Sequence, residues 1–221
     1  MLNVIYEDNH LLVVEKPVNI LSQGDNTNDD DMVNLLKKYL KEKYNKPGNV
    51  FVGLVHRLDR PVGGIMVFAK TSKAASRLSE QVRNKTFKKT YKAVLHGEMK
   101  KKQDNLSDYL YKDKKTNMVS AVNKNHKDAK DAKLSYKTLA SNNGFSLVEI
   151  DLQTGRPHQI RVQFSSRNHP LYGDQRYGKN VNKKGQQIAL WSYKIEIEHP
   201  TKKEKMEFVC EPPNKYPWNM F

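Results

Sequence analysis

A single acidic side chain, Asp59, lies between two arginines in the stretch HRLDR, shortly before the glycine pair Gly63-Gly64. Apolar runs flank the stretch, so we expect it to lie where a strand ends and its side chains project from a rigid edge. A carboxylate beside a guanidinium stays ionised at neutral pH, because the positive charge lowers its pKa. Such a group can act as a nucleophile or as a general base. The alternative is a surface ion pair of Asp59 with Arg57 or Arg60, which would contribute about 0–1 kcal/mol to stability.

Two further segments are dense in polar residues. In KKTYKAVLHGE, Tyr91 lies in the middle of a predicted strand among lysines, where an aromatic ring usually packs into the core. In QTGRPHQIRVQFSSRNHPLYGDQRYG, Arg156 lies at the start of a predicted helix and Arg161 lies within it. Because Thr154-Gly155 would let a backbone approach the first N–H groups of that helix, we predict a phosphate seat there. A surface arginine that contacts phosphate is the alternative for Arg161.

The charge of the chain points to a polyanionic partner. The 221 residues include 39 Lys and Arg against 24 Asp and Glu, a formal net charge of +15. Clustered cations gain affinity for phosphates by releasing counterions, so nucleic acid is the leading partner, although a lysine-rich codon usage could also raise the charge. The single cysteine, Cys210, excludes a disulfide within one chain. No apolar run approaches the ~20 residues of a membrane span and no paired Cys/His spacing occurs, so we predict a cytoplasmic protein without a metal site.

The elements around these segments indicate an α+β domain. Helices are expected over 32–44, after the capping acids of TNDDD, over 71–84 and over 156–167, where Pro157 suits the first helical position. The connection 99–133 is expected to be the most exposed part. Strands are expected over 11–14, 51–55, 65–70, 88–97, 134–140, 145–153, 188–198 and 205–210. We therefore predict one domain over residues 1–221, built on a mixed, largely antiparallel sheet with flanking helices.

The three polar segments together resemble a known family. HRLDRPVGG, KKTYKAVLHG and TGRPHQIRVQFSSRNHPLYGDQRYG, in this order, are similar to the motif set of the RluA family of RNA pseudouridine synthases. YEDNHLLVVEKPVNILSQ and DYLYKDKKTNMV also resemble the family's pattern, so the similarity covers nearly the whole chain. It implies the pseudouridine synthase fold and an isomerase that converts specific uridines of structured RNA to pseudouridine. It implies neither a cofactor nor a metal.

The resemblance also implies residue roles. Asp59 would be the catalytic aspartate, Tyr91 the active-site tyrosine that packs on the target base, and Arg161 the arginine paired with the aspartate. Arg57 would enter the RNA stack where the target uridine has been flipped out. We further predict RNA contacts by His56, Arg60, Lys88, Lys89, Arg156 and His158.

Two features depart from the family's pattern. Val62-Gly63-Gly64 stands where many members have Thr-Ser-Gly, which removes two hydroxyls but keeps the turn glycine. The chain is expected to begin at the catalytic domain, without the N-terminal S4-type RNA-binding domain of many relatives. The source of target selection is then open.

Other readings stay open at this point. The chain could be a catalytically inactive RNA-binding or RNA-folding module of the same fold. A nuclease or glycosylase using Asp59 with a histidine would instead cleave the chain or release free uracil. The resemblance allows large-subunit ribosomal RNA and transfer RNA stem-loops as targets, and a monomer is expected because no coiled-coil pattern is evident.

Overall fold

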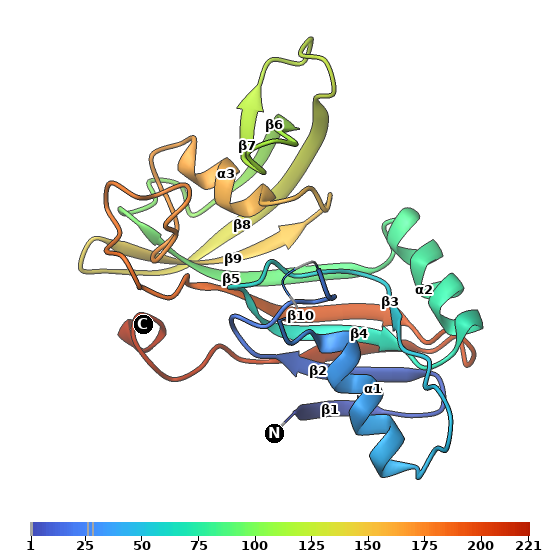
Figure 1. The fold of residues 1–221 in the computed structure, drawn as a ribbon. Coiled ribbons are helices and arrows are strands. Elements are labelled where there is room, and N and C mark those ends of the chain that lie inside the picture. The colour runs from blue at the N-terminus through green and yellow to red at the C-terminus, as the bar shows by residue number, and fades with distance from the viewer. Residues whose placement is uncertain (1, 26, 28) are drawn as a thin grey trace. The chain divides into compact units, whose positions relative to one another are not determined.

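The computed structural model describes residues 2–25, 27 and 29–221. Within these residues the helices are α1 (Met32–Lys43), α2 (Ser72–Arg83), α3 (Gln159–Ser165) and the 3-10 helix η1 (Trp218–Met220). The strands are β1 (Asn3–Glu7), β2 (Leu11–Lys16), β3 (Gly53–Leu54), β4 (Gly63–Ala69), β5 (Lys88–His96), β6 (Gln103–Lys112), β7 (Val119–Val122), β8 (Lys130–Asn142), β9 (Phe145–Leu152), β10 (Leu190–Glu198) and β11 (Lys205–Val209). Figure 1 labels them along the chain.

The chain divides into two compact units. The first is formed by the chain up to Lys88 together with Ser192–Glu211, and the second by Lys89–Trp191 together with Pro212–Phe221. The predicted α+β class with a largely antiparallel sheet is confirmed, because β1-β2, β2-β4, β3-β4 and β10-β11 of the first unit and β5-β9, β8-β9, β6-β8 and β6-β7 of the second all pair antiparallel. The expectation of one catalytic domain over residues 1–221 stays a prediction.

The first unit is built on the strand order β1-β2-β4-β10, with β3 paired to β4 and β11 to β10. Every residue of β4 is buried, as are the four apolar residues that open β2, which is why both sequences read as continuous apolar runs. Helix α1 buries Met32, Leu36 and Leu40, which recur at helical spacing. The HRLDR segment lies between β3 and β4 of this unit.

The helix starts of this unit follow their predicted caps. The Asp31 carboxylate accepts a hydrogen bond from the Asn34 backbone N–H at 3.1 Å, and the Thr71 hydroxyl accepts one from the Ala74 N–H at 3.2 Å. Each cap satisfies a backbone donor that the first turn of a helix leaves without a partner. The predicted starts of α1 and α2 are therefore confirmed.

The second unit is built on the strand order β5-β9-β8-β6-β7. Tyr91 of β5 pairs with Ile150 of β9, which pairs with Tyr136 of β8. Because directly paired residues point to the same face of a sheet, these three side chains share one face. Helix α3 packs on that face, where the ring of Phe164 meets the ring of Tyr136 at a centroid distance of 5.4 Å.

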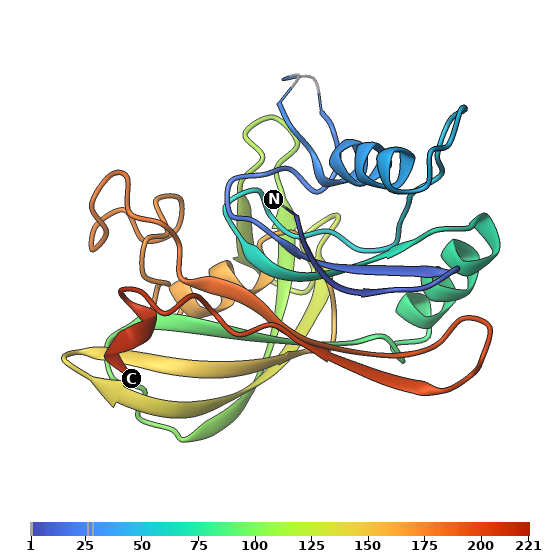
Figure 2. The same cartoon turned by 90° about the horizontal axis from the view of Figure 1, so that it is seen from below.

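The opposite face of this sheet is covered by the C-terminal residues. Trp218, Met220 and Phe221 pack against the cluster that contains Val94 and Ala189. The Asn142 side chain also donates a hydrogen bond to the Met220 carbonyl at 2.8 Å. Figure 2 shows this end of the chain, in red, beside the hairpin of β8 and β9, in yellow. The face that carries Tyr91 is therefore distinct from the face that the C-terminus covers.

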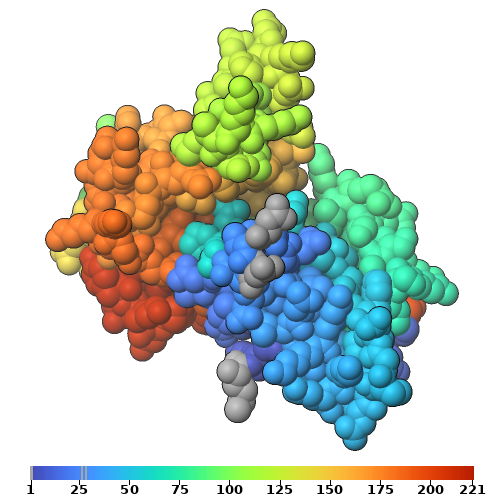
Figure 3. Space-filling model, in the orientation of Figure 1, coloured from blue at the N-terminus to red at the C-terminus, as the bar shows by residue number. Residues whose placement is uncertain are grey.

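The connection 99–133, expected to be the most exposed part of the chain, contains strands that were not predicted. It holds β6, β7 and the start of β8, with Leu106 paired to Leu134 and Tyr109 paired to Val122. Leu106 and Leu110 face the core, while the lysines of residues 112–130, yellow-green in Figure 3, lie on the surface. The high lysine content concealed this strand from prediction. Its two inward-facing leucines are four residues apart, and residues at an even spacing point to the same face of a strand.

Three element boundaries also differ from the predictions. Strand β1 was not predicted, and β3 covers only two residues of the predicted 51–55. Helix α3 begins at Gln159 and not at Pro157, because His158 adopts a left-handed conformation with φ of 51°. A left-handed residue cannot continue the preceding turn as a right-handed helix.

None of the helices among the described residues is long and apolar enough to cross a membrane.

Candidate active site

The segment around Asp59 is extended, and its side chains alternate between core and surface. His56 and Leu58 are buried, whereas Arg57 is exposed and Asp59 is half-buried. In an extended chain residues two apart point the same way. Arg57 and Asp59 therefore lie on the accessible side of the segment, although apolar runs flank it in the sequence.

Buried polar contacts hold this segment in place. The Leu58 N–H donates to the Ser22 hydroxyl at 3.0 Å, and that hydroxyl donates to the Leu58 carbonyl at 2.8 Å. The His56 Nε2 accepts a hydrogen bond from the Val67 N–H at 3.0 Å, so the ring carries its proton on Nδ1. These are contacts of a structural histidine, and an RNA contact by His56 stays a prediction.

A fully buried lysine ties the Asp59 turn to the end of β2. The Lys16 side chain is 0% exposed, and its Nζ donates to the carbonyls of Pro17 at 2.8 Å, Ile20 at 2.6 Å and Arg60 at 3.1 Å. Burial lowers the pKa of Lys16 to about 7, while the negative charge of Asp59 acts in the opposite direction. Three carbonyl acceptors match the three donors of an ammonium group. The residue after Asp59 is thus anchored through its main chain.

Replacing this lysine should loosen the turn. Lys16→Met keeps approximately the length of the side chain but removes the donor of three carbonyls. A buried polar group that is left unsatisfied costs about 1–3 kcal/mol. We expect a lower free energy of unfolding in urea and a lower rate of product formation per folded molecule. Lys73→Met, at an exposed lysine of α2, is the control and should change neither. Full activity in the folded Lys16→Met variant would contradict the anchoring role.

Arg60 is occupied on the surface of the first unit. Its Nη1 forms an ion pair with Asp29 at 2.7 Å, and its Nε donates to the Asn19 carbonyl at 3.2 Å. The turn then closes with a hydrogen bond from the Val62 N–H to the Asp59 carbonyl at 2.9 Å. Val62 is 2% exposed and belongs to the core.

Tyr91 lies on the α3 side of the second unit's sheet. It is 6% exposed, so most of its ring is in contact with protein. Lys89 shares this face because it lies two residues earlier in the strand, and burial lowers the pKa of its ammonium group. The Nζ of Lys89 lies beside Gly155, and a side chain at position 155 would bring its Cβ to 3.3 Å from that nitrogen. Lys88 points the other way and is exposed.

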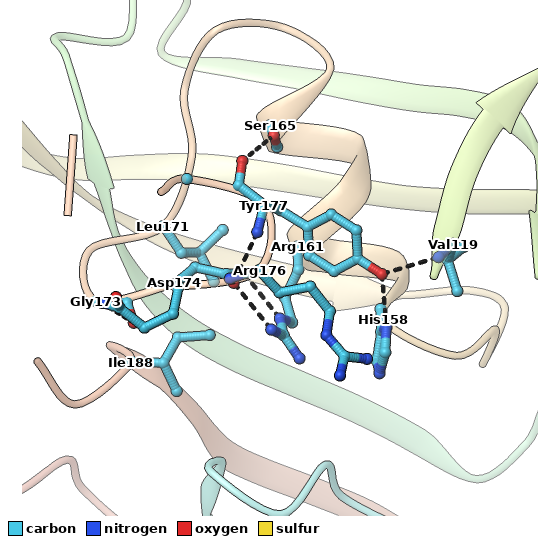
Figure 4. Close-up of polar contacts among 12 residues, drawn as sticks. Val119, His158, Arg161, Ser165, Leu171, Gly173, Asp174, Arg176, Tyr177 and Ile188 are labelled. Carbon is cyan, nitrogen blue, oxygen red and sulfur yellow. Dashed lines mark hydrogen bonds and ion pairs between the residues drawn. The ribbon is translucent and has the colours of Figure 1, made fainter. Parts of the chain in front are cut away.

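Arg161 is held by an acid that the sequence analysis did not single out. Its Nε and Nη2 each donate to an oxygen of Asp174 at 2.8 Å, which makes a bidentate pair (Figure 4). Both side chains are buried, with Arg161 7% and Asp174 1% exposed. Burial would raise the pKa of Asp174, but Arg161 and the backbone N–H groups of Tyr177 and Arg176 together lower it. Asp174 is therefore an ionised partner that fixes one edge of the guanidinium.

Tyr177 connects this pair to His158. The guanidinium carbon of Arg161 lies 5.1 Å from the centre of the Tyr177 ring. The Tyr177 hydroxyl accepts a hydrogen bond from the Val119 N–H at 3.0 Å and lies 2.6 Å from Nδ1 of His158. Arg161, Asp174, Tyr177 and His158 thus form one connected group in the second unit, shown in Figure 4.

Arg156 lies before α3 and is held by contacts with β8 and with the first residue of α3. Its Nε donates to the Asp131 carbonyl at 2.8 Å, and its backbone N–H donates to the side-chain oxygen of Gln159 at 3.1 Å. The Thr154 hydroxyl donates to the same Gln159 oxygen at 2.8 Å. The side chain of Gln159 thus closes the turn at which we expected a phosphate, and an RNA contact by Arg156 stays a prediction.

Asn182 was missed entirely by the sequence analysis, yet it organises the turn that carries Asp174. Its Nδ2 donates to the carbonyls of Leu171, Asp174 and Gly178, and its Oδ1 accepts from the Gly173 N–H at 2.6 Å. No sequence signal marks it, whereas Asp174 could have been found as an acid inside a basic motif. Among the described residues, no three His, Cys, Asp or Glu side chains gather as metal ligands would.

Known proteins place this arrangement in a family. A family model described as RNA pseudouridylate synthase matches residues 10–166, which include Asp59, Tyr91 and Arg161. The chain belongs to this family. The predicted family and enzyme class are thereby confirmed: the protein is an RNA pseudouridine synthase of the RluA type, an isomerase.

Relatives of this synthase are similar over nearly its full length. It is 34% identical over 215 residues to the uncharacterized RNA pseudouridine synthase YhcT of Bacillus subtilis, covering 96% of this chain and 68% of that protein. It is 32% identical over 218 residues to the ribosomal large subunit pseudouridine synthase D of Borreliella burgdorferi, covering 96% of this chain and 66% of that protein. The synthase therefore spans about two thirds of the length of these relatives.

Solved structures confirm the predicted fold. The structure named Human RNA Pseudouridylate Synthase Domain Containing 4 matches the synthase with a TM-score of 0.78 at 21% identity, over 96% of this chain and 88% of that chain. Human RNA Pseudouridylate Synthase Domain Containing 1 matches with a TM-score of 0.76 at 23% identity, over 98% and 85%. The roles of individual residues of the synthase stay predictions.

Proposed function

We propose that this synthase isomerises a uridine of large-subunit ribosomal RNA, with Asp59 as the catalytic carboxylate. The position of Asp59 carries the proposal: it is half-buried, on the accessible side of an anchored segment that lies within the matched family region. The RNA class is supported by the names of relatives, among them the ribosomal large subunit pseudouridine synthase D of Borreliella burgdorferi.

The reaction itself needs one well-placed carboxylate. The bond between C1′ of the ribose and N1 of uracil breaks, the base turns, and C1′ is joined to C5. The proton lost from C5 is balanced by the proton that N1 gains, so no oxidant or reductant takes part. Asp59 would start these reaction steps either by attacking C1′ or by taking the proton from C2′. Both routes need the ionised form of Asp59 beside the sugar.

In this proposal Tyr91 contacts the target base, and Arg161 supplies a positive charge to the active site. The ring of Tyr91 offers uracil a stacking partner, which contributes about 1–3 kcal/mol per base. Arg161 is oriented by Asp174 through two of its five N–H donors, so its direction is set before RNA binds. The pairing of Arg161 with Asp59 remains a prediction of the family resemblance.

The target uridine must leave its stack to reach Asp59. Extruding a base costs a few kcal/mol and costs least in loops and unpaired regions. Arg57 is exposed on the same side of the segment as Asp59, where its planar guanidinium can stack on the bases next to the gap. This arrangement favours stem-loops over continuous duplex as substrates.

Mapping pseudouridine in a deletion strain and its parent tests the target. We expect one or a few positions of large-subunit ribosomal RNA to lose the modification, and a plasmid copy of the gene to restore them. The copy with Asp59→Asn should fail to restore them. Loss confined to transfer RNA would overturn the proposed RNA class, and no loss in any RNA would favour an RNA-binding module.

A further inference from the structure

A cavity of about 200 Å³ lies within the second unit, and none of its walls is formed by Tyr91 or Arg161. Its walls come from the turn between β5 and β6, the first half of β6, the middle of β8, and α3 with the residues that follow it; Figure 1 labels these elements. Pockets for drug-sized ligands usually measure about 300–1,000 Å³. The cavity is therefore suited to one ring system of a larger ligand.

The cavity is lined by a hydrogen-bond donor without a partner. Tyr136 is 6% exposed, and among the described residues no group accepts a hydrogen bond from its hydroxyl. Burial and the negative charge of Asp104 raise the pKa of this hydroxyl, so it keeps its proton at neutral pH. Nearly all buried polar groups have a hydrogen-bond partner, and a ligand that enters the cavity can supply one here.

The wall around this hydroxyl is apolar and aromatic. The ring of Tyr136 meets the ring of Phe164 edge-on at a centroid distance of 5.4 Å, and Leu106 beside them is 5% exposed. Unpaired RNA bases are recognised by aromatic contacts to their rings together with hydrogen bonds to their edges. An apolar wall with one hydroxyl donor has the chemistry that a base carbonyl and its ring require.

The charges that line the cavity are mainly positive. Lys100 and Lys101 are exposed, and the side chain of Arg167 is 36% exposed. Asp104 is the one acid among the lining residues, and Lys101 pairs with it at 2.8 Å. Lys100 makes no ion pair within the part of the chain that the structure describes. An unpaired lysine suits a phosphate, so the charge favours a nucleotide over a neutral ligand.

The cavity and Tyr91 lie on the same face of the second unit's sheet. Tyr136 pairs with Ile150, and Ile150 pairs with Tyr91, so the two tyrosines share a face two strands apart. Two strand spacings amount to about 10 Å between the backbones. One RNA molecule that reaches Tyr91 can therefore also reach the cavity.

We propose that this cavity binds an unpaired base of the RNA substrate other than the target uridine, with the Tyr136 hydroxyl donating to the base and Lys100 contacting its phosphate. The inference rests on the proposed function for its RNA ligand. Nucleotide binding by the cavity needs no catalysis and can be measured separately.

The methyl group of Met99, which lines the cavity, reports its occupancy. In protein with 13C-labelled methionine methyl groups, uridine or adenosine 5′-monophosphate should shift the Met99 signal and leave that of Met220, on the opposite face of the sheet, unchanged. Tyr136→Phe should weaken the apparent affinity by about 3- to 10-fold, the range of one hydrogen bond. Tyr109→Phe, on the other face of β6, is the matched control and should not. An unchanged Met99 signal at the solubility limit of both nucleotides, or an equal shift with inorganic phosphate alone, would overturn the proposal.

The RNA part of the proposal is tested with a short stem-loop containing the mapped uridine. Tyr136→Phe should raise its dissociation constant by about 3- to 10-fold and leave the single-turnover rate at saturating RNA near the wild-type value. Lys100→Ala should reduce the slope of log Kd against log salt concentration by about 0.7–0.9, the effect of one phosphate contact, whereas Lys102→Ala should not. Equal slopes in the two lysine variants would contradict the phosphate contact. An inactive wild-type protein whose Met99 signal still shifts with nucleotide would contradict only the proposed function.

Discussion

Asp59→Asn is expected to abolish pseudouridine formation while leaving RNA binding intact. Asparagine keeps the size of the side chain but can neither attack C1′ nor accept a proton from C2′, so we expect the single-turnover rate to fall by at least about 10²–10⁴-fold. Release of tritium from RNA labelled at uridine C5 measures this rate directly. Because the substitution removes one negative charge, the RNA dissociation constant should stay within about threefold of the wild-type value or decrease.

Two comparisons make the Asp59 result decisive. Asp128→Asn changes an exposed acid of the second unit and should retain the wild-type rate. Nucleoside chromatography of the wild-type product should show pseudouridine without strand cleavage or free uracil. Tritium release by Asp59→Asn at the wild-type rate would show that another group performs the chemistry, and free uracil would identify a glycosylase.

Asp174→Asn is expected to destabilise the folded protein strongly. The substitution removes the carboxylate charge that pairs with the buried Arg161 guanidinium, and breaking a buried ion pair in this way costs about 3–5 kcal/mol. Urea unfolding followed by circular dichroism measures the loss. Asp108→Asn is the matched control, because its partner Arg167 is 36% exposed and such pairs contribute about 0–1 kcal/mol. Equal losses in the two variants would contradict the importance of burial.

The stability difference should depend on pH with a definite sign. The folded-state pKa of Asp174 is below its ordinary value of 3.8, so its contribution is fully present above about pH 4 and is lost as the pH falls further. The difference in the free energy of unfolding between wild type and Asp174→Asn should therefore become smaller in acid. The double variant Asp174→Leu with Arg161→Met should recover stability but not activity, since apolar residues can replace a buried pair only as packing.

The sequence predicted the helices and the core strands best, because their signals are local. The caps at Asp31 and Thr71 and the apolar runs of β2 and β4 are each readable within a few residues. Strands β6 and β7 escaped prediction because their outward positions are lysines, so composition suggested an exposed connection. Amphipathic strands of this kind are specified by their partners, which lie far along the chain.

The site was predicted by motif, but its supporting residues were not. Asp174 lies 13 residues beyond Arg161, so their pairing depends on the turn that Asn182 builds and on no short-range pattern. The left-handed conformation of His158 likewise follows from tertiary contacts, since histidine has only a modest preference for it. Residue types can indicate a chemistry, whereas the groups that orient them emerge only when the chain is folded.

The ammonium cage of Lys16 has a consequence for how freely this protein can vary. Its three acceptors are main-chain oxygens, which every amino acid supplies. Substitutions at Ile20 or Arg60 therefore change side chains without removing an acceptor. The loop beside Asp59 can then vary in sequence while its backbone conformation stays the same. Only the lysine itself is irreplaceable in that arrangement.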